Sequence, residues 1–276
     1  MTSARAVSRV KRLLPKKTRV GHTGTLDPLA SGLLVLLIGR STRLSRYVTD
    51  LDKAYTATAR FGAVSDTLDA EGDITALGTP FPSQAAIDAA LPAFTGDLLQ
   101  IPPMASALKR DGTRLYELHR RGISVEREPR PITVHELRLT SHDPAEQTAT
   151  FELSCTSGTY VRTLIADLAT YMGSGAYLTA LRRTSVGHLD LENASTPEAL
   201  DPETLHNHII HAVKLVAHLP GVAVPVGEGR RLVCHGRPTE RRGFDGSYRV
   251  MCGEELLAVY RDRGDEGRAE VVLCAG

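Results

Sequence analysis

Two segments with strictly alternating apolar residues constrain the fold of this chain most. Side chains on one face of residues 53–61 and of residues 148–156 are apolar, and alternation with a period of two predicts β-strands with one buried face. The inward positions are Tyr55, Ala57, Ala59 and Phe61 in the first segment, and Ala149, Phe151, Leu153 and Cys155 in the second. Shortly afterwards, Val161, Leu164, Ile165 and Leu168 recur at helical spacing and predict a helix ending near Gly173. The chain must therefore build a sheet with helices packed on it.

The other predicted elements are short and follow no regular strand–helix alternation. Residues 3–14 have the spacing of an amphipathic helix stopped by Pro15, and Ser83 is a predicted N-cap for a helix through Ala90. Further helices are expected over 42–48 and 114–121, and strands over 33–38 and 132–139. Irregular interleaving favours an α+β fold over a doubly wound parallel sheet.

A different pattern begins near Leu219. From Val222 onward, β-like stretches at 222–226, 247–252, 256–260 and 270–274 alternate with Gly, Asp and Arg turns. This texture predicts a small β-barrel of roughly 55–60 residues, near the lower limit for an independent domain. We therefore expect one domain over residues 1–218 and a second over 219–276.

Composition excludes several classes of protein. Hydrophobic residues make up 42% and charged residues 24%, which are ordinary values for a globular chain. Neither a membrane-length apolar run nor the apolar core of a signal peptide is present in the sequence, which favours a soluble cytoplasmic protein. The cysteines are scattered without a C-x-x-C pair, so the spacing indicates neither a disulfide framework nor a cysteine-rich zinc site; they are Cys155, Cys234, Cys252 and Cys274.

The net charge of +1 hides two basic segments. Residues 1–20 carry seven cations and no acid, and residues 109–131 carry a net charge of +3. Residues 49–100 are acidic instead. Clustered cations in a nearly neutral chain suggest a face that binds a polyanion, and solvated helix faces explain the pattern equally well.

Residues 21–32 hold the most informative stretch for chemistry, Gly-His-Thr-Gly-Thr-Leu-Asp-Pro-Leu-Ala-Ser-Gly. Its glycines permit close backbone approach, and Pro28 fixes the backbone directly after Asp27. A carboxylate on a rigid turn before a buried strand is well placed to act as nucleophile or base. A plain Asp-Pro turn is the alternative. A phosphate-binding loop is less consistent, because the G-x-x-x-x-G-K-[ST] pattern is absent.

This stretch resembles the G-H-x-G-T-L-D-P-x-A-x-G motif of the TruB family, the tRNA pseudouridine-55 synthases. The resemblance continues in order through later motifs and covers residues 3–187. They are Lys53-Ala54-Tyr55, the run from Gln100 to Lys109, Arg114 to Leu118, Ser157 to Thr163, and Leu178 to Arg183. It implies a pseudouridine synthase fold with a mixed, mainly antiparallel sheet flanked by helices.

The resemblance implies catalytic roles for three residues. Asp27 matches the nucleophile in a reaction that detaches uracil from its ribose, rotates it and rejoins it through C5. Tyr55 matches the aromatic residue that stacks on the target uracil and helps proton removal from C5. Arg162 matches the cation that pairs with the catalytic carboxylate. The reaction is an isomerisation without net redox change, so no cofactor or metal is implied.

Further residues match substrate-binding positions of the family. Tyr160 matches a tyrosine that contacts the base, Leu181 a leucine that lines the pocket, and His22 a histidine that inserts into the RNA loop. Considered alone, Tyr55 and Leu181 are core residues of a strand or packed layer, and Arg162 is a surface residue of a helix. A lone His22 would be structural or simply exposed.

The implied substrate is the tRNA T stem-loop, which gives the basic segments a partner. Phosphate contacts are expected from Arg9, Lys16, Lys17, Lys109 and Arg114. More weakly, residues 219–276 resemble the PUA-type RNA-binding domain of the family; packing without RNA contact is the alternative. The resemblance implies a monomer without an obligate protein partner. The rival hypotheses are a guide-dependent ribonucleoprotein synthase of the same family and a non-catalytic tRNA-binding or tRNA-folding protein.

The sequence departs from the family pattern at two places and contains two clusters of residue types that can bind metals. Family members open with a strand carrying G-x-x-x-x-D-K-P-x-G, which is missing before Met1, and Ala105 replaces a frequent aromatic residue. The histidines His206, His208, His211 and His218 lack accompanying acid or cysteine ligands. The acids Asp66, Asp69, Glu71 and Asp73 lack the glycine offset and final Glu of a calcium loop, so we expect a solvated turn.

Overall fold

The computed structural model describes residues 1–110 and 112–274, and Asp111 of the basic segment lies outside the described residues. The chain forms two compact units. The first comprises Met1–Thr25, Leu34–Thr49 and Glu192–Gly276, and the second comprises Leu26–Leu33 and Asp50–Leu191. The Gly21–Gly32 stretch therefore contributes to both units.

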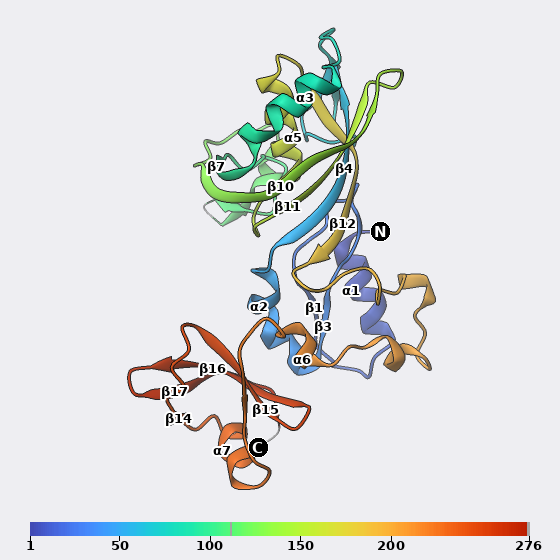
Figure 1. Ribbon diagram of the computed structural model, residues 1–276. Helices are drawn as coiled ribbons and strands as arrows, with labels where there is room; N and C mark the ends of the chain where they lie inside the picture. The colour runs from blue at the N-terminus through green and yellow to red at the C-terminus, as the bar shows by residue number, and fades with distance from the viewer. Residues whose placement is uncertain (111, 275–276) are drawn as a thin grey trace. The chain divides into compact units, whose positions relative to one another are not determined.

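The second unit is built on a six-stranded mixed sheet with the order β2-β12-β4-β11-β10-β7 (Figure 1). Its only parallel ladder among the described residues joins β2 to β12, and the other neighbours are antiparallel. The strands are β2 (Ser31–Gly32), β4 (Lys53–Phe61), β7 (Gly96–Gln100), β10 (Arg130–Asp143), β11 (Thr148–Cys155) and β12 (Ala176–Val186). The mixed, mainly antiparallel sheet and the α+β class predicted from the sequence are confirmed.

Helices α3 (Gln84–Ala90) and α5 (Val161–Tyr171) pack against this sheet (Figure 1). The alternating residues predicted to face inward do so, because Ala57, Ala59 and Phe61 of β4 and their partners on β11 join Leu164, Ile165 and Leu168 in one core. Ser83 caps α3 by accepting a hydrogen bond from the Ala86 backbone at 3.2 Å, as the sequence predicts. Burial of this alternating face fixes the register of the strands.

Strand β12 was not predicted from the sequence. Residues 176–186 are mostly apolar at the start and carry Arg182 and Arg183 near the end, without the alternation that marks β4 and β11. Two register shifts against β4 explain the broken pattern, since each shift exchanges the faces of the residues that follow. The remaining short elements of this unit are β5 (Ala63–Ser65), β6 (Ile74–Ala76), β8 (Lys109–Arg110), β9 (Thr113–Arg114) and α4 (Leu115–His119).

The first unit begins with α1 (Ser3–Arg12), where the Thr2 side chain accepts from the backbone of Arg5. Strands β1 (Val20–His22) and β3 (Leu36–Ile38) pair antiparallel, and the buried residues Leu33, Val35 and Leu37 account for the apolar run seen in the sequence. A 3-10 turn at Gly39–Leu44 leads into α2 (Ser45–Thr49). Near the C-terminal part of the chain lie α6 (Ala212–Leu215) and α7 (Glu228–Cys234).

The expected C-terminal β-rich region is a five-stranded sheet with the order β13-β15-β16-β17-β14. Its strands are β13 (Gly221–Ala223), β14 (Thr239–Glu240), β15 (Ser247–Cys252), β16 (Glu255–Arg263) and β17 (Glu266–Val272). A core of Val233, Tyr248, Val250, Leu257 and Tyr260 lies between the sheet and α7. This packing explains the alternation of short apolar stretches with polar turns.

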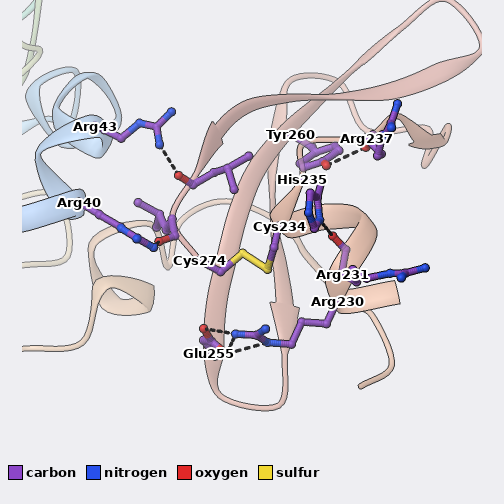
Figure 2. Close-up of a disulfide and its surroundings, with 12 residues drawn as sticks. Arg40, Arg43, Arg230, Arg231, Cys234, His235, Arg237, Glu255, Tyr260 and Cys274 are labelled. Atoms are coloured by element: carbon purple, nitrogen blue, oxygen red, sulfur yellow. Dashed lines mark hydrogen bonds and ion pairs between the residues drawn. A yellow bond between two sulfur atoms is a disulfide. The ribbon is translucent and has the colours of Figure 1, made fainter. Parts of the chain in front are cut away.

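The described residues contain one disulfide, which the spacing of the cysteines does not indicate. Cys234 at the end of α7 is bonded to Cys274, which follows β17 (Figure 2). The two residues are 40 positions apart, and the fold joins them because the backbone NH groups of Leu273 and Cys274 both donate to the Leu257 carbonyl. Local spacing rules cannot detect such a pair. Cys155 and Cys252 are free.

Within residues 1–110 and 112–274, no helix has both the length and the apolar character required to cross a bilayer. In the same part of the chain, no group of three or more His, Cys, Asp and Glu residues is arranged to hold a metal ion.

Candidate active site

Asp27 lies on a turn that leads directly into the edge strand of the six-stranded sheet. The Ala30 backbone donates to the Asp27 carbonyl at 2.9 Å, and β2 then pairs with Arg182 and Arg183 of β12. Gly32 has φ +95°, and a Cβ at this position would lie 2.2 Å from the Arg183 carbonyl oxygen. The last glycine of the motif is therefore required by a close backbone approach that holds the Asp27 turn against β12.

Arg162 clamps the Asp27 carboxylate from the first turn of α5. Its Nε donates to Asp27 Oδ2 at 2.9 Å. The Arg162 side chain is only 4% exposed, whereas the Asp27 side chain is 36% exposed. The view of Arg162 as a surface helix residue is therefore wrong, and the pairing that the family resemblance implies is present. The Asp27 side chain therefore stays partly accessible to solvent while it is held.

The rest of the Arg162 guanidinium is fully engaged by two other segments. Nη1 donates to the Thr67 carbonyl at 2.7 Å and lies 3.5 Å from Asp69 Oδ2, and Nη2 donates to the Ala105 carbonyl at 2.9 Å. A planar guanidinium with its donors in fixed directions can join several acceptors at once. Arg162 thus joins the Asp27 turn, the 65–73 loop and the beginning of the 105–121 segment.

Asp69 is a site residue that the sequence analysis missed. Its side chain is only 5% exposed, so the prediction of a solvated turn fails at this position while Asp66, Glu71 and Asp73 are exposed. Asp69 Oδ1 accepts from the Thr67 hydroxyl at 2.7 Å and from the Glu71 backbone at 3.0 Å. No local pattern separates Asp69 from its acidic neighbours; its burial follows from the pairing of its loop with Leu178 on β12.

Tyr55 lies on β4 between Leu153 of β11 and Arg183 of β12. Burial raises the pKa of Tyr55 to about 12, while the positive charge and hydrogen bond of Arg183 oppose this rise and the charge of Asp27 adds to it. The phenol is therefore neutral at ordinary pH.

Tyr160 and Leu181 lie on different elements of the second unit. Tyr160 precedes α5, and its backbone exchanges two hydrogen bonds with the buried Gln100 side chain, at 2.8 and 3.1 Å. Burial also raises the pKa of Tyr160, which the Ser106 hydroxyl partly offsets. Leu181 on β12 is buried opposite Ala57 and belongs to the main core.

The remaining predicted RNA-contact residues are spread over both units. His22, Arg9, Lys16 and Lys17 belong to the first unit, with His22 half-buried on β1 opposite Leu36 and both lysines exposed. The half-buried Arg9 donates to the Pro197 carbonyl, so its side chain also has a structural partner. In the second unit, Lys109 and Arg114 are exposed on the β8–β9 hairpin.

A clamped carboxylate on this mixed sheet is the arrangement that the resemblance implies for a pseudouridine synthase. Residues 11–161 match the model described as TruB family pseudouridylate synthase (N terminal domain). The chain belongs to this family and is a pseudouridine synthase, an isomerase. A protein named tRNA pseudouridine synthase B from Azoarcus sp. (strain BH72) is 40% identical over 262 residues, covering 94% of this chain and 86% of the relative. One of the same name from Burkholderia mallei (strain NCTC 10247) is 50% identical over 204 residues, covering 74% of this chain and 67% of the relative.

Solved structures share the fold at lower sequence identity. A chain in the crystal structure of a Cbf5-Nop10-Gar1 complex aligns with a TM-score of 0.71 and 22% identity, covering 100% of this chain and 82% of the matched chain. A chain in an H/ACA RNP structure bound to a substrate RNA containing 2'-deoxyuridine aligns with a TM-score of 0.70 and 20% identity, covering 99% and 82%. These similarities support the pseudouridine synthase fold.

Proposed function

We propose that this protein converts the T-loop uridine at position 55 of tRNA to pseudouridine without a guide RNA, with Asp27 as nucleophile. The observation that carries this proposal is the Arg162–Asp27 pair, in which a buried guanidinium holds a carboxylate that stays accessible to solvent. The names of the relatives support tRNA as the substrate. An accessible, oriented carboxylate is suited to nucleophilic attack.

In the proposed reaction, Asp27 forms a transient covalent bond to the nucleotide while the bond between N1 and C1′ breaks. The base rotates, a bond between C5 and C1′ forms, the bond to Asp27 breaks and frees the carboxylate, the C5 proton leaves and N1 gains a proton. Atoms and electrons balance without an oxidant or reductant. Tyr55 would stack on the base and Arg162 would keep the Asp27 carboxylate oriented through the rearrangement.

Recognition would come from the substrate-binding and basic residues together. Tyr160 and Leu181 would bound the base pocket, and His22 would insert into the loop from which the base is flipped. Exposed cations, including Lys16, Lys17, Lys109 and Arg114, would contact phosphates and make binding dependent on salt. Arg9 would contact a phosphate only after giving up its hydrogen bond to the Pro197 carbonyl.

The organisation around the site is part of the same proposal. Residues 1–218 would be the catalytic domain and residues 219–276 a PUA-like RNA-binding domain. The protein would act as a cytoplasmic monomer without an obligate protein partner. The five-stranded sheet of the C-terminal region and the basic residues Arg230, Arg231 and Arg237 near α7 support an RNA-binding role for it (Figure 2).

Tritium release tests the proposal directly. Unmodified tRNA transcript labelled at C5 of uridine is incubated with the wild-type chain, with Asp27→Asn, and with a transcript in which the T-loop uridine is cytidine. We expect release with the wild type alone. If the wild type binds tRNA but releases no tritium, the enzyme assignment for this chain is wrong and the tRNA-binding hypothesis replaces it. Release that persists with the cytidine transcript would contradict the T-loop site.

A further inference from the structure

His119 and Asp66 form a contact outside the catalytic group that none of the proposed roles uses. His119 Nε2 lies 3.1 Å from Asp66 Oδ2, with both side chains partly exposed. We propose that His119 and Asp66 are positioning residues that hold the basic 105–121 segment against the active-site loop for RNA binding. This inference rests on the proposed function, because the segment is assigned there to phosphate contacts.

The 65–73 loop, which carries Asp66, is held in place by hydrogen bonds within the loop, to β12 and to Arg162. Asp66 Oδ1 accepts from the Asp73 backbone at 2.8 Å, which closes the loop. The Ala70 and Leu178 backbones bond the loop to β12 at 2.9 and 3.0 Å, through the Leu178 and Leu68 carbonyls respectively. On its other side, the Thr67 carbonyl binds Arg162. Asp66 therefore has a fixed place relative to the catalytic carboxylate.

The 105–121 segment is linked to the 65–73 loop through Arg162 at its beginning and directly at His119 near its end. At the beginning, the Ala105 carbonyl accepts from Arg162 Nη2. At the other end, His119 is the last residue of α4 and contacts Asp66. Between them, the Tyr116 backbone donates to the Ser106 carbonyl at 3.1 Å and the Leu115 backbone to the Leu108 carbonyl at 2.8 Å, so the segment folds back on itself.

The charges of this segment make its placement matter for RNA. The exposed side chains of Lys109, Arg110, Arg114 and Arg121 lie along it, and a phosphate backbone is bound better when such cations are already ordered. The Asp66 carboxylate contacts the His119 imidazole with one oxygen and accepts from the Asp73 backbone with the other, so it ties the end of α4 to the 65–73 loop. Loss of the pair should weaken RNA binding while leaving the Arg162–Asp27 geometry in place.

The test uses a double-mutant cycle with His119→Ala, Asp66→Ala and the double variant, measured for kcat and KM on tRNA. We expect each single variant to raise KM about two- to fivefold, the range of an exposed ion pair, with kcat unchanged. The double variant should be no worse than Asp66→Ala, since the pair is already broken and the loss of the Asp73 contact is common to both. His119→Gln, whose amide nitrogen can donate to Asp66, should recover most of the wild-type KM.

His135→Ala is the matched control. His135 Nε2 lies 3.0 Å from Asp52 Oδ2 in the same unit, with both side chains partly exposed and no link to the 65–73 loop among the described contacts. It should leave KM unchanged. Hydrogen exchange on the free protein should show faster exchange over residues 115–121 in His119→Ala and not in His135→Ala. Unchanged KM and exchange in His119→Ala, or effects that add in the double variant, would overturn the inference. Absence of product with the wild type would instead reject the proposed function.

Discussion

Arg162 Nε and Asp27 Oδ2 lie 2.9 Å apart although the two residues are separated by 135 positions in the sequence. The contact joins a turn before the edge strand β2 to the first turn of α5. Because the same guanidinium also binds the Thr67 and Ala105 carbonyls, the orientation of the proposed nucleophile also depends on the 65–73 loop and on the beginning of the 105–121 segment.

Arg162→Lys should therefore abolish most activity although the charge is retained. A lysine ammonium has all its donors on one nitrogen and cannot span the acceptors that Nε, Nη1 and Nη2 reach separately, so the orientation of Asp27 would be lost. We expect kcat to fall by about 10²-fold or more, in the range of removing one oriented electrostatic partner. Tritium release and a thermal melt of the same sample separate this effect from unfolding. Activity within tenfold of the wild type would show that Arg162 does not orient the nucleophile.

Asp69→Asn tests the buried carboxylate that lies beside Arg162 Nη1. The amide would keep an oxygen for the Thr67 and Glu71 donors but would remove the negative charge beside Nη1. We expect about a tenfold fall in kcat and a loss of about 1–3 kcal/mol in the free energy of unfolding, because a buried cation loses one partner. Asp73→Asn in the same loop is exposed and should change neither quantity. An equal effect of both variants would assign the loss to the loop and not to the Arg162 contact.

The difference between Asp69 and Asp73 shows where prediction from the sequence ends. Alternation located β4 and β11, and helical spacing located α5, because burial of one face leaves a local signal. The Asp27 turn and Arg162 were identified from ordered motifs that resemble a known family. Burial of Asp69 is instead imposed by long-range pairing with Leu178 on β12, and the Cys234–Cys274 bond by the path of the chain after β17. Neither leaves a pattern within its own segment.

Gly32→Ala should destabilise the fold around Asp27. The new Cβ would lie 2.2 Å from the Arg183 carbonyl oxygen, and φ +95° is strained for any residue with a side chain. We expect a loss of at least about 1–3 kcal/mol in the free energy of unfolding and a matching loss of activity. Gly21→Ala is the control, since its Cβ would meet nothing within 4 Å and its φ needs no glycine. Urea titration of both variants checks this, and equal stabilities would contradict the requirement for glycine at position 32.

Tyr55→Phe should reduce the loss of stability at alkaline pH. Tyr55 ionises near pH 10 in the unfolded chain, and burial raises its pKa to about 12 in the folded protein. The contribution of the buried, neutral phenol to the free energy of unfolding is complete below pH 10. It is lost as the pH rises from 10 to 12, because only the unfolded state releases the proton there. Urea titration at pH 9 and at pH 11.5 gives the free energy of unfolding of both proteins. Between these two pH values, the wild type should lose more of this free energy than the variant. A difference that does not change with pH would contradict burial of the phenol.

Breaking the Cys234–Cys274 bond should weaken the C-terminal sheet selectively. A cross-link that closes a loop of 40 residues stabilises the folded state by about 4 kcal/mol through the entropy of the unfolded chain. The segment before Cys274 accepts hydrogen bonds from Arg43 at the Val272 carbonyl and from Arg40 at the Leu273 carbonyl (Figure 2). In Cys274→Ser, no covalent bond would hold this segment in place, and only hydrogen bonds would remain. We expect a lower melting temperature and faster hydrogen exchange over residues 228–274. Cys252→Ser, which removes a free and half-buried thiol, is the control. If dithiothreitol lowers the melting temperature of the wild type and leaves that of Cys274→Ser unchanged, the bond stabilises the protein; equal responses of the two proteins would reject it.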